Sequence, residues 1–481
     1  MKPENLRKKY KKFIYNSYSY KISKKNLEIF FDFGIEPGII FKPKIVIKNI
    51  DKSRIKKIGK GVLNNLVFNL GLIEMISYWK ATCSKEIEIK AGYLNQSQIK
   101  WWKNLIKNGM GQFFYKNKLD FKIADSLKII SDSKKRNDFE IFEKKLGNKI
   151  LLPIGGGKDS IVSLEILKKS KYPLACFSLN PTDASKKILK VGGCKKSIIV
   201  KRKIDSKLLE LNRKGFLNGH TPFSAYLAFL TVLIGVIFDY TDIVFSNERS
   251  SNEGNIKYLG KTINHQYSKS FDFEKKFRNY SKKYLVKNIE YFSFLRPLYE
   301  IRIGKLFSKY FNKYGNLFLS CNEAHKTKSG TKKPTGEWCG KCPKCLFIFT
   351  SLYPFIDKEK IIKIFGQNLF EKKELLPLMK ELIGIEKFKP FECIGTKKES
   401  SIAFYLSWKK ANRRGEEPVL LKYFKTKVLS LKTRKGFAKG LSRHLKLEKE
   451  SREIMTSWNK KHNLPKEFVK YLKNPLILDK F

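Results

Sequence analysis

The chain has 481 residues, of which 42% are hydrophobic and 14% aromatic, and this composition excludes a protein that is disordered over most of its length. The 100 Lys and Arg residues outnumber 44 Asp and Glu and give a formal charge of +56, which suits a polyanionic partner such as nucleic acid, an acidic membrane or a nucleotide-linked substrate. Because the lysines run along the whole chain, with abundant Ile, Asn, Phe and Tyr that AT-rich codons also encode, charge alone does not identify a partner.

The cysteines and the apolar segments indicate a cytoplasmic protein without a membrane partner. The basic start of the chain leads into no apolar core, so no signal peptide is expected. Residues 223–238 are the most apolar stretch, but a membrane-spanning helix needs about 20 residues, and a buried helix is expected instead. Eight cysteines in a chain of this length do not suggest a disulfide framework, which favours a reducing compartment.

Residues 1–145 mix strand and helix patterns and are predicted to form an N-terminal α+β domain. The expected elements are strands at 39–41 and 45–47 and helices at 61–80 and 96–107. This part contains no catalytic signature of known spacing. A lysine-rich polar link at 131–145 precedes the next domain.

Residues 146–355 are predicted to form a parallel α/β sheet with helices on both faces, because strand and helix patterns alternate. The expected strands are 150–154, 174–179, 197–200 and 242–245, and the expected helices are 160–167, 208–212 and 223–238. Ligands of such sheets bind at the carboxyl ends of the strands, so the loops at 154–160, 180–183 and 246–255 are candidate site loops. Residues 356–481 are predicted to form a basic, mainly helical C-terminal region.

A glycine loop between the first of these strands and its helix is the strongest motif. It consists of Gly155, Gly156, Gly157, Lys158, Asp159 and Ser160. Glycines let successive backbone N–H groups approach phosphate oxygens, and the helix N-terminus faces the same anion. The spacing is neither that of a Walker A loop nor that of a dinucleotide fingerprint. An ordinary glycine-rich turn is the alternative.

The loop resembles that of the PP-loop ATP pyrophosphatases, with Gly155 at the usual serine position. The resemblance implies an adenine nucleotide alpha hydrolase-like fold. It also implies that ATP is cleaved to AMP and pyrophosphate, with adenylation of a substrate oxygen.

A cysteine cluster is the second motif and consists of Cys321, Cys339, Cys342 and Cys345. Thiolates at this spacing can converge on one tetrahedral ion, so a structural Zn²⁺ is predicted. An iron–sulfur cluster and buried free cysteines are alternatives, since the sequence does not separate two thiolate-bound metals.

Three polar strings, at 217–224, 246–253 and 264–270, complete the candidate site, although turns and helix caps favour the same residue types. The nucleotide-binding candidates are Asn247, Glu248, Arg249 and Glu253, of which Glu248 and Glu253 are candidates for Mg²⁺. The candidates for proton transfer are His220, His265 and Lys269.

The order of these strings resembles the UDP-N-acetylmuramoyl-L-alanyl-L-glutamate epimerase family over roughly residues 10–405, with Ser251 where Ala is expected. The further strings that carry the resemblance are Ser77-Tyr78-Trp79-Lys80, Asn218-Gly219-His220-Thr221-Pro222, Leu295-Arg296-Pro297-Leu298 and Phe391-Glu392-Cys393-Ile394-Gly395-Thr396. The resemblance implies that ATP and Mg²⁺ drive inversion of the terminal glutamate of a UDP-linked muramoyl dipeptide, with release of AMP and diphosphate. Adenylation of the α-carboxylate would remove its charge and make the α-proton acidic.

Three other functions fit part of the sequence. A ligase similar to 7-cyano-7-deazaguanine synthase also joins a PP-loop to a cysteine-rich site, but it leaves the first 145 residues unexplained. A tRNA-modifying PP-loop enzyme would use the positive charge of the chain to bind the phosphates of the tRNA. The third alternative is a zinc-containing nucleic-acid-binding module without catalysis. It predicts no ATP cleavage, so the glycine loop argues against it.

Overall fold

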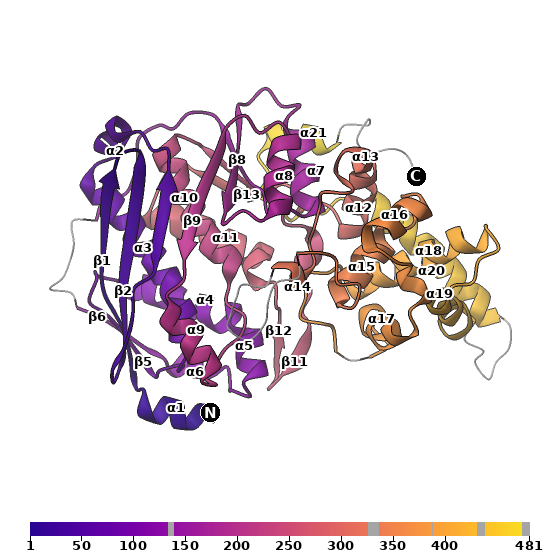
Figure 1. Cartoon of the computed structure of the whole chain (residues 1–481), viewed down its shortest axis with the longest axis horizontal. Helices are drawn as coiled ribbons and strands as arrows, with labels where there is room; N and C mark the ends of the chain where they lie inside the picture. The colour runs from indigo at the N-terminus through magenta and orange to yellow at the C-terminus, as the bar shows by residue number, and fades with distance from the viewer. Residues whose placement is uncertain (133–138, 326–335, 387, 431–437, 474–481) are drawn as a thin grey trace.

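The computed structural model describes residues 1–132, 139–325, 336–386, 388–430 and 438–473, and its main feature is one long mixed sheet (Figure 1). The 11-stranded sheet has the order β13-β10-β7-β8-β9-β4-β2-β1-β5-β6, with β3 paired to β2. Its strands are β1 (Lys12–Ser23), β2 (Asn26–Glu36), β3 (Ile39–Phe41), β4 (Lys44–Lys48), β5 (Glu86–Ile89), β6 (Lys128–Ser131), β7 (Ile150–Pro153), β8 (Leu174–Leu179), β9 (Ser197–Lys203), β10 (Asp242–Phe245) and β13 (Glu290–Ser293).

The sheet has a parallel half, and the strand prediction for this half is confirmed. The four predicted strands correspond to β10, β7, β8 and β9, which run parallel to one another, and β13, which was not predicted, adds a fifth parallel strand beside β10. Strand β9 then pairs antiparallel with β4, which joins the parallel half to the long β1–β2 hairpin. The sheet therefore runs across the domain boundary predicted at residue 145, and the division into domains stays a prediction. Beside it lies a small hairpin, β11 (Ile256–Tyr258) and β12 (Lys261–Ile263).

Helices cover both faces of the parallel half, as predicted, because its strands are apolar on both sides. Along β7 the side chain of Leu151 joins one core, and those of Ile150 and Leu152 join the other. The first core includes α3 (Lys60–Trp79), α10 (Phe223–Phe238) and α11 (Phe271–Tyr284). The second includes α7 (Lys158–Leu167), α8 (Asp183–Val191), α12 (Glu300–Ser308) and α15 (Pro343–Leu352). Helix α10 is apolar all round and buried, and no helix in the described part of the chain could cross a membrane.

The remaining helices fall in the two halves of the chain. Those of the N-terminal half are α1 (Pro3–Lys9), α2 (Lys52–Ile58), α4 (Gln96–Gly109), α5 (Gly111–Lys116), α6 (Ile123–Ser126) and α9 (Ser206–Arg213). Those of the C-terminal half are α13 (Phe311–Tyr314), α14 (Asn322–His325), α16 (Lys358–Phe365), α17 (Leu376–Ile383), α18 (Lys397–Asn412), α19 (Val419–Tyr423), α20 (Ala438–Thr456) and α21 (Lys466–Lys473). The mainly helical C-terminal region is confirmed. Its last helix returns to the sheet, where the Phe468 ring lies 5.0 Å from that of Phe292 (Figure 1).

One disulfide joins Cys176 in β8 to Cys194, which precedes β9. The other cysteines are free. Cysteine spacing does not predict this pair, because the two residues meet only where neighbouring strands place them.

Candidate active site

The glycine loop lies at the carboxyl end of β7, at the edge of the parallel half where the sequence places it. Gly156 has φ +99°, which favours glycine, and a side chain at Gly157 would lie 3.5 Å from Cβ of Ser320. Gly157 caps α7, and its carbonyl accepts a 2.9 Å hydrogen bond from Oγ of Ser160. The backbone N–H of Leu319 donates to the carbonyl of Gly156 at 2.9 Å. The segment before Cys321 therefore holds the loop in shape.

Lys158 is the buried cation of the loop. Its Nζ lies 2.5 Å from Asp159 Oδ1 and 3.2 Å from Glu300 Oε1, and Lys344 Nζ lies 3.3 Å from the same Glu300 oxygen. Burial lowers the pKa of Lys158, but the charges of Asp159 and Glu300 outweigh it and raise that pKa above its ordinary value. Burial likewise raises the pKa of Glu300, but Lys158 and Lys344 outweigh it and lower that pKa to about 2. Both charges persist at neutral pH.

Glu248 is a buried carboxylate that follows β10. Burial and the neighbouring charge of Glu300 raise the pKa of Glu248 to about 7, although Lys269 opposes the shift. Glu253, the other carboxylate expected to bind Mg²⁺, lies with Oε2 2.6 Å from Nζ of Lys389. Of these two residues, Glu248 therefore shares the charge network of the glycine loop, while Glu253 forms an ion pair with the C-terminal half.

The other nucleotide-binding candidates contact the end of β13 and the segment that follows it. The amide of Asn247 donates to Ser293 Oγ at 3.0 Å and is buried. The Arg249 guanidinium lies 4.2 Å from the centre of the Tyr299 ring. These contacts join the ends of β10 and β13, so the 246–255 loop lies at the edge of the sheet where it is expected.

Arg296 fixes two of the polar strings relative to each other. It is fully buried, and Nη1 donates to the carbonyl of Glu248 at 2.7 Å and to Ser251 Oγ at 2.8 Å. Its Nη2 donates to the carbonyl of Lys269 and forms an ion pair with Glu274 at 3.1 Å. The guanidinium therefore orients the backbone on which Glu248 and Lys269 are carried.

His220 and His265 form a pair, which we call the histidine pair, with ring centres 4.3 Å apart. Nδ1 of His265 lies 2.5 Å from Oε1 of Gln112, so Nδ1 donates and Nε2 keeps a free lone pair. Burial and Lys269 lower the pKa of His265 to about 3, and burial and His265 hold that of His220 well below its usual value. Both rings are therefore neutral. Nδ1 of His220 is buried and accepts or donates no hydrogen bond among the described residues.

Lys80 holds the loop that carries His220. Its Nζ donates to Asn218 Oδ1 at 2.8 Å and to the carbonyl of Gly219 at 2.9 Å. Burial and Arg202 lower the pKa of Lys80 to about 8. Two strings that lie far apart in the sequence, Ser77–Lys80 and 217–224, therefore meet at one side of the histidine pair.

Lys269 interacts electrostatically with both the glycine loop and the histidine pair. Its Nζ donates to Sγ of Cys393 at 3.2 Å. Burial lowers its pKa, but Cys393 and Glu248 outweigh it and hold the pKa of Lys269 above its ordinary value. Since Lys269 also lowers the pKa of both histidines, one cation interacts electrostatically with Glu248, the histidine pair and Cys393.

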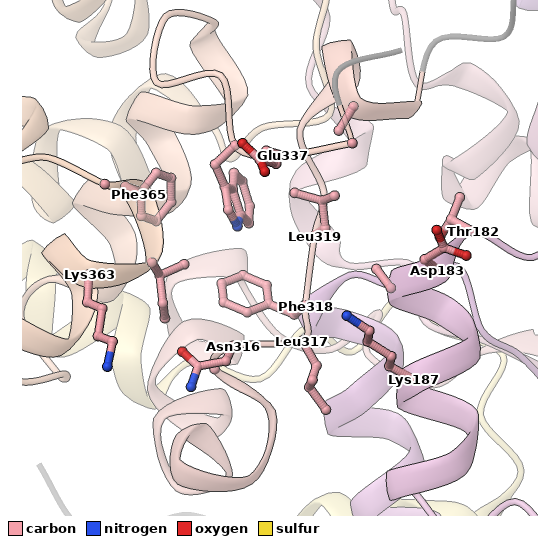
Figure 2. Close-up of a pocket in the computed structure, with 17 residues that line it drawn as sticks. Thr182, Asp183, Lys187, Asn316, Leu317, Phe318, Leu319, Glu337, Lys363 and Phe365 are labelled. Carbon is pink, nitrogen blue, oxygen red and sulfur yellow. The ribbon is translucent and has the colours of Figure 1, made fainter.

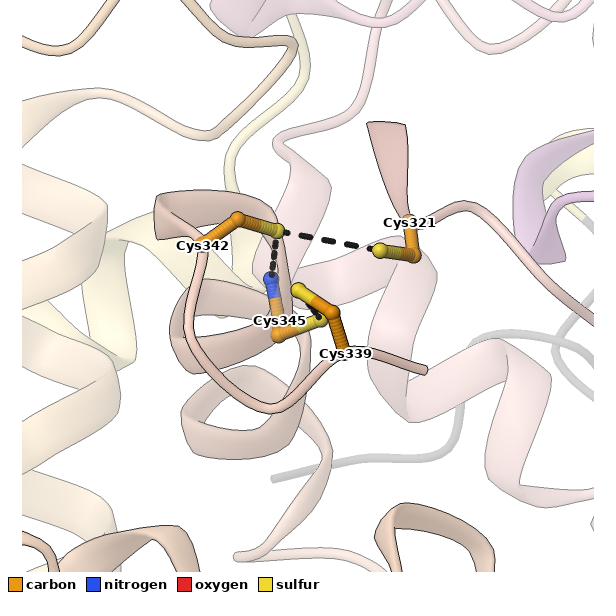
Figure 3. Close-up of side chains that lie close together, drawn as sticks. All are labelled: Cys321, Cys339, Cys342 and Cys345. Carbon is orange, nitrogen blue, oxygen red and sulfur yellow. Dashed lines mark hydrogen bonds between the residues drawn. The ribbon is translucent and has the colours of Figure 1, made fainter. Parts of the chain in front are cut away.

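The cysteine cluster is brought together as predicted (Figure 3). All four Sγ atoms lie within 4.8 Å of one another, and the Cys321–Cys342 and Cys339–Cys345 separations are 3.9 and 3.7 Å. Four thiolates placed tetrahedrally about 2.3 Å from one ion would be about 3.8 Å apart. The cluster therefore has the geometry of a site for a single metal ion.

A cavity of about 730 Å³ opens beside the glycine loop. Figure 2 shows Lys187 of α8 on one side of it and Phe318 and Phe365 on the other. A side chain at Gly156 would lie 3.6 Å from Cβ of Ala184, which also lines the cavity, so the cavity adjoins the loop. Its lining includes residues of the 180–183 loop, the second predicted site loop.

Sequence reasoning assigned no role to Glu300, Lys344 or Cys393. Glu300 follows β13, a strand that was not predicted, although the short, mostly apolar run at 291–294 was its signal. Lys344 and Cys393 are brought in by the C-terminal half, and nothing local in the sequence marks them as site residues.

Comparison with known proteins identifies related sequences over most of the chain. A family model described as the MurL N-terminal domain matches residues 4–294, and one described as the MurL C-terminal domain matches residues 317–435. A Micromonospora sp. protein named UDP-N-acetyl-alpha-D-muramoyl-L-alanyl-L-glutamate epimerase is 32% identical over 340 residues, 70% of this chain and 73% of the relative. Proteins of the same name from Salinispora tropica and Xanthomonas oryzae pv. oryzae are 32% identical over 337 and 343 residues, covering 70% and 69% of this chain and 72% of each relative.

Proposed function

Because the chain belongs to the MurL family of UDP-N-acetyl-alpha-D-muramoyl-L-alanyl-L-glutamate epimerases, we propose that its glycine loop and histidine pair act in succession on the terminal glutamate of that substrate. The enzyme epimerises this glutamate in peptidoglycan precursor synthesis. The proposal concerns the mechanism: ATP activates the glutamate, and a proton is then exchanged at its α-carbon. We place the reaction in the cytoplasm, where ATP and the nucleotide-linked substrate are available.

Activation explains why an epimerase carries an ATP-cleaving loop. The α-proton of a glutamate with a free carboxylate is very weakly acidic, because its removal places negative charge beside an existing anion. Attack of the α-carboxylate on the α-phosphate of ATP forms an acyl-adenylate and expels diphosphate. The acyl group can then accept the carbanion as an enolate. Water finally releases AMP from the inverted product.

The glycine loop and the adjoining cavity support ATP binding. The strand–loop–helix unit at the carboxyl edge of a parallel sheet supports the adenine nucleotide alpha hydrolase-like fold. We propose that the loop and the α7 N-terminus hold the phosphates, with Lys158 adding its charge. The cavity of about 730 Å³, with Phe318 and Phe365 among its lining, would take the adenosine.

Mg²⁺ fits the carboxylates beside Lys158. Glu248 and Asp159 interact electrostatically, since the charge of Asp159 raises the pKa of Glu248, whereas the Glu300 oxygen is shared by two lysines. We propose that Asp159 and Glu248 bind Mg²⁺ together with the ATP phosphates, in keeping with the preference of Mg²⁺ for one or two carboxylates plus phosphates. The ion would neutralise charge on those phosphates.

A structural Zn²⁺ fits the cysteine cluster, because four thiolates with no other ligand among the described residues leave no open position for catalysis. The ion would fix the segment that carries Leu319 against Gly156 and Lys344 against Glu300. The metal therefore supports the shape of the glycine loop.

We propose that His265 removes the α-proton and that Cys393 returns one on the opposite face. Nε2 of His265 takes the proton, the Cα–H bond breaks, and its electron pair enters the enolate. The S–H bond of Cys393 then breaks, its proton goes to the α-carbon, and the thiolate remains beside the Lys269 ammonium. Lys269, expected from the sequence as a base, is held in its charged form and instead supports the thiolate. His220 packs against His265 and orients it.

The observation that carries the mechanism is the position of Lys269, which interacts with the carboxylate at the glycine loop, with the histidine pair and with Cys393. The test is incubation with ATP, Mg²⁺ and UDP-N-acetylmuramoyl-L-alanyl-L-glutamate in D₂O. AMP, D-glutamate and deuterium at the α-carbon are expected from the wild type. AMP without D-glutamate would contradict epimerisation through an adenylate.

Variants separate the two proton carriers. Cys393→Ala is expected to release AMP and to place deuterium in recovered L-glutamate without forming D-glutamate. His265→Asn is expected to lose both exchange and inversion from the L-substrate. Cys83→Ser, at a buried free cysteine outside the site, is the control. Inversion by Cys393→Ala at the wild-type rate would remove Cys393 from the mechanism.

A further inference from the structure

A second cavity, of about 450 Å³, lies along α4 and is lined by lysines. Lys100, Lys103 and Lys107 are spaced three and four residues apart, so their side chains share one face of the helix. The other lining residues are Gln96, Ile99, Asn104 and Asp125. We call this site the α4 lysine cavity.

Two more lysines lie beside the α4 lysine cavity. Nζ of Lys276 donates to Asn104 Oδ1 at 3.1 Å and forms an ion pair with Asp272 at 2.8 Å. Nζ of Lys261 lies 5.2 Å from the centre of the Phe121 ring, which also borders Lys107. Three elements, α4, α11 and β12, therefore direct cations to one place.

The nearby carboxylates do not balance this charge. Asp125 Oδ2 lies 2.5 Å from Nζ of Lys107, but within the described ranges Lys100 has no carboxylate partner. Burial and the charge of Lys107 lower the pKa of Lys261 to about 8. A bound anion reduces the electrostatic repulsion between lysines that lie this close together. A phosphate group can accept hydrogen bonds from several ammonium groups at once.

Helix α4 connects the α4 lysine cavity to the loops that carry the histidine pair. Gly109, the last residue of α4, is so close to Pro222 that an added Cβ would lie 2.8 Å from the proline Cβ, and Pro222 is two residues from His220. Asn104 lines the cavity and accepts from the Tyr267 hydroxyl at 3.4 Å, two residues from His265. The lysine row therefore leads away from the proposed proton-transfer site.

The dimensions suit the substrate. At about 1.5 Å per residue, the row from Lys107 to Lys100 extends from about 3 to about 14 Å beyond Gly109 along the helix axis. In the substrate, the alanine and the lactyl group span about 7 Å from the glutamate, at about 3.5 Å for each unit, and the sugar ring adds to this before the diphosphate. A diphosphate at that distance from the α-carbon falls within the length of the row.

We propose that the α4 lysine cavity binds the diphosphate of the nucleotide-linked substrate and so positions its terminal glutamate at the histidine pair. This inference rests on the proposed function, in which the glutamate α-carbon lies beside His265. The ligand is recognised by its doubly charged diphosphate rather than by its peptide.

The test is a binding measurement with and without the diphosphate. Isothermal titration calorimetry measures the dissociation constants of UDP-N-acetylmuramoyl-L-alanyl-L-glutamate, of N-acetylmuramoyl-L-alanyl-L-glutamate and of ATP for the Lys100→Ala/Lys103→Ala enzyme. The control is Lys52→Ala/Lys56→Ala, which removes the same charge from exposed positions on α2. Both double variants change exposed or half-buried lysines, and unchanged melting temperatures check their folding.

The expected result is about a tenfold or larger loss of affinity for the UDP-linked substrate alone, since a hydrogen bond to a charged group commonly accounts for a factor of this size. Affinity for the UDP-free dipeptide and for ATP should be unchanged, and the control should bind like the wild type. Equal losses for both dipeptides, a loss for ATP instead, or no loss would overturn the inference. The D₂O assay on the wild type tests the proposed function separately.

Discussion

Lys344 lies beside Cys345 of the cysteine cluster, and its Nζ is 3.3 Å from Oε1 of Glu300, which also pairs with Lys158 of the glycine loop at 3.2 Å. A second link runs from Leu319, two residues before Cys321, to the carbonyl of Gly156. The cysteine cluster is therefore connected to the glycine loop on two sides, once through a side chain and once through the backbone.

Removing the metal is expected to impair ATP cleavage without any change in the loop itself. Cys342→Ser should lose the bound zinc, and release of AMP with substrate should fall by about tenfold or more, because the segments holding Gly156 and Glu300 lose their anchor. Elemental analysis and a diphosphate-release assay measure the two effects, and Cys83→Ser is the control. A metal-free enzyme with wild-type AMP release would contradict a supporting role for the ion.

The buried charges at the loop should also matter for folding. Glu300→Gln leaves Lys158 and Lys344 buried without their shared partner, and loss of one member of a buried ion pair costs about 3–5 kcal/mol. Urea unfolding should therefore show a decrease of this size in the free energy of unfolding. Glu374→Gln, at a carboxylate that is 65% exposed and pairs with Lys372, should change it by less than about 1 kcal/mol. A Glu300→Gln protein as stable as the wild type would contradict this prediction, and would mean that water solvates the ammonium groups of Lys158 and Lys344.

The parallel half of the sheet could be predicted because its strands are short, continuously apolar and separated by helical patterns. Strand β8 and helix α10 begin and end where predicted. The long β1–β2 hairpin was not predicted. The outer half of β1 alternates exposed and half-buried residues and is rich in serine, and such a pattern is typical of loops as well as edge strands, whereas β2 alternates buried and half-buried residues.

The site could be predicted only where a local motif carries it. The glycine loop and the cysteine cluster have diagnostic spacing, and both come together in the structure. Glu300 and Cys393 lack such spacing, because each reaches the site through packing between distant segments. Their partners Lys158 and Lys269 lie 142 and 124 residues away along the chain. Whether a buried lysine is charged also depends on such distant partners. This is why Lys269 was predicted to act as a base.

Mg²⁺ binding should depend on pH through Glu248. The pKa of Glu248 is raised to about 7, so the group is protonated and unable to bind the ion below that pH and becomes a carboxylate ligand above it. The rise in melting temperature on adding Mg²⁺ and a non-hydrolysable ATP analogue should therefore be larger at about pH 8 than at about pH 6. Glu248→Gln should show a small rise at both pH values. A wild-type response that does not change with pH would remove Glu248 from the magnesium site.

Filling the cavity beside the glycine loop should weaken ATP binding selectively. Ala184 lines this cavity on α8 and is half-buried, so a tryptophan at this position can occupy the space without displacing a core side chain. Ala184→Trp is expected to raise the KM for ATP by about tenfold or more, while the dissociation constant of the UDP-linked substrate stays unchanged. Steady-state kinetics at saturating dipeptide substrate measure the first effect, and calorimetry measures the second.

The matched control is Lys186→Ala, at an exposed residue of the same helix that does not line the cavity. If Ala184→Trp instead weakens the UDP-linked substrate and leaves ATP unaffected, the cavity binds the uridine end of that substrate and the adenosine lies elsewhere along the sheet edge.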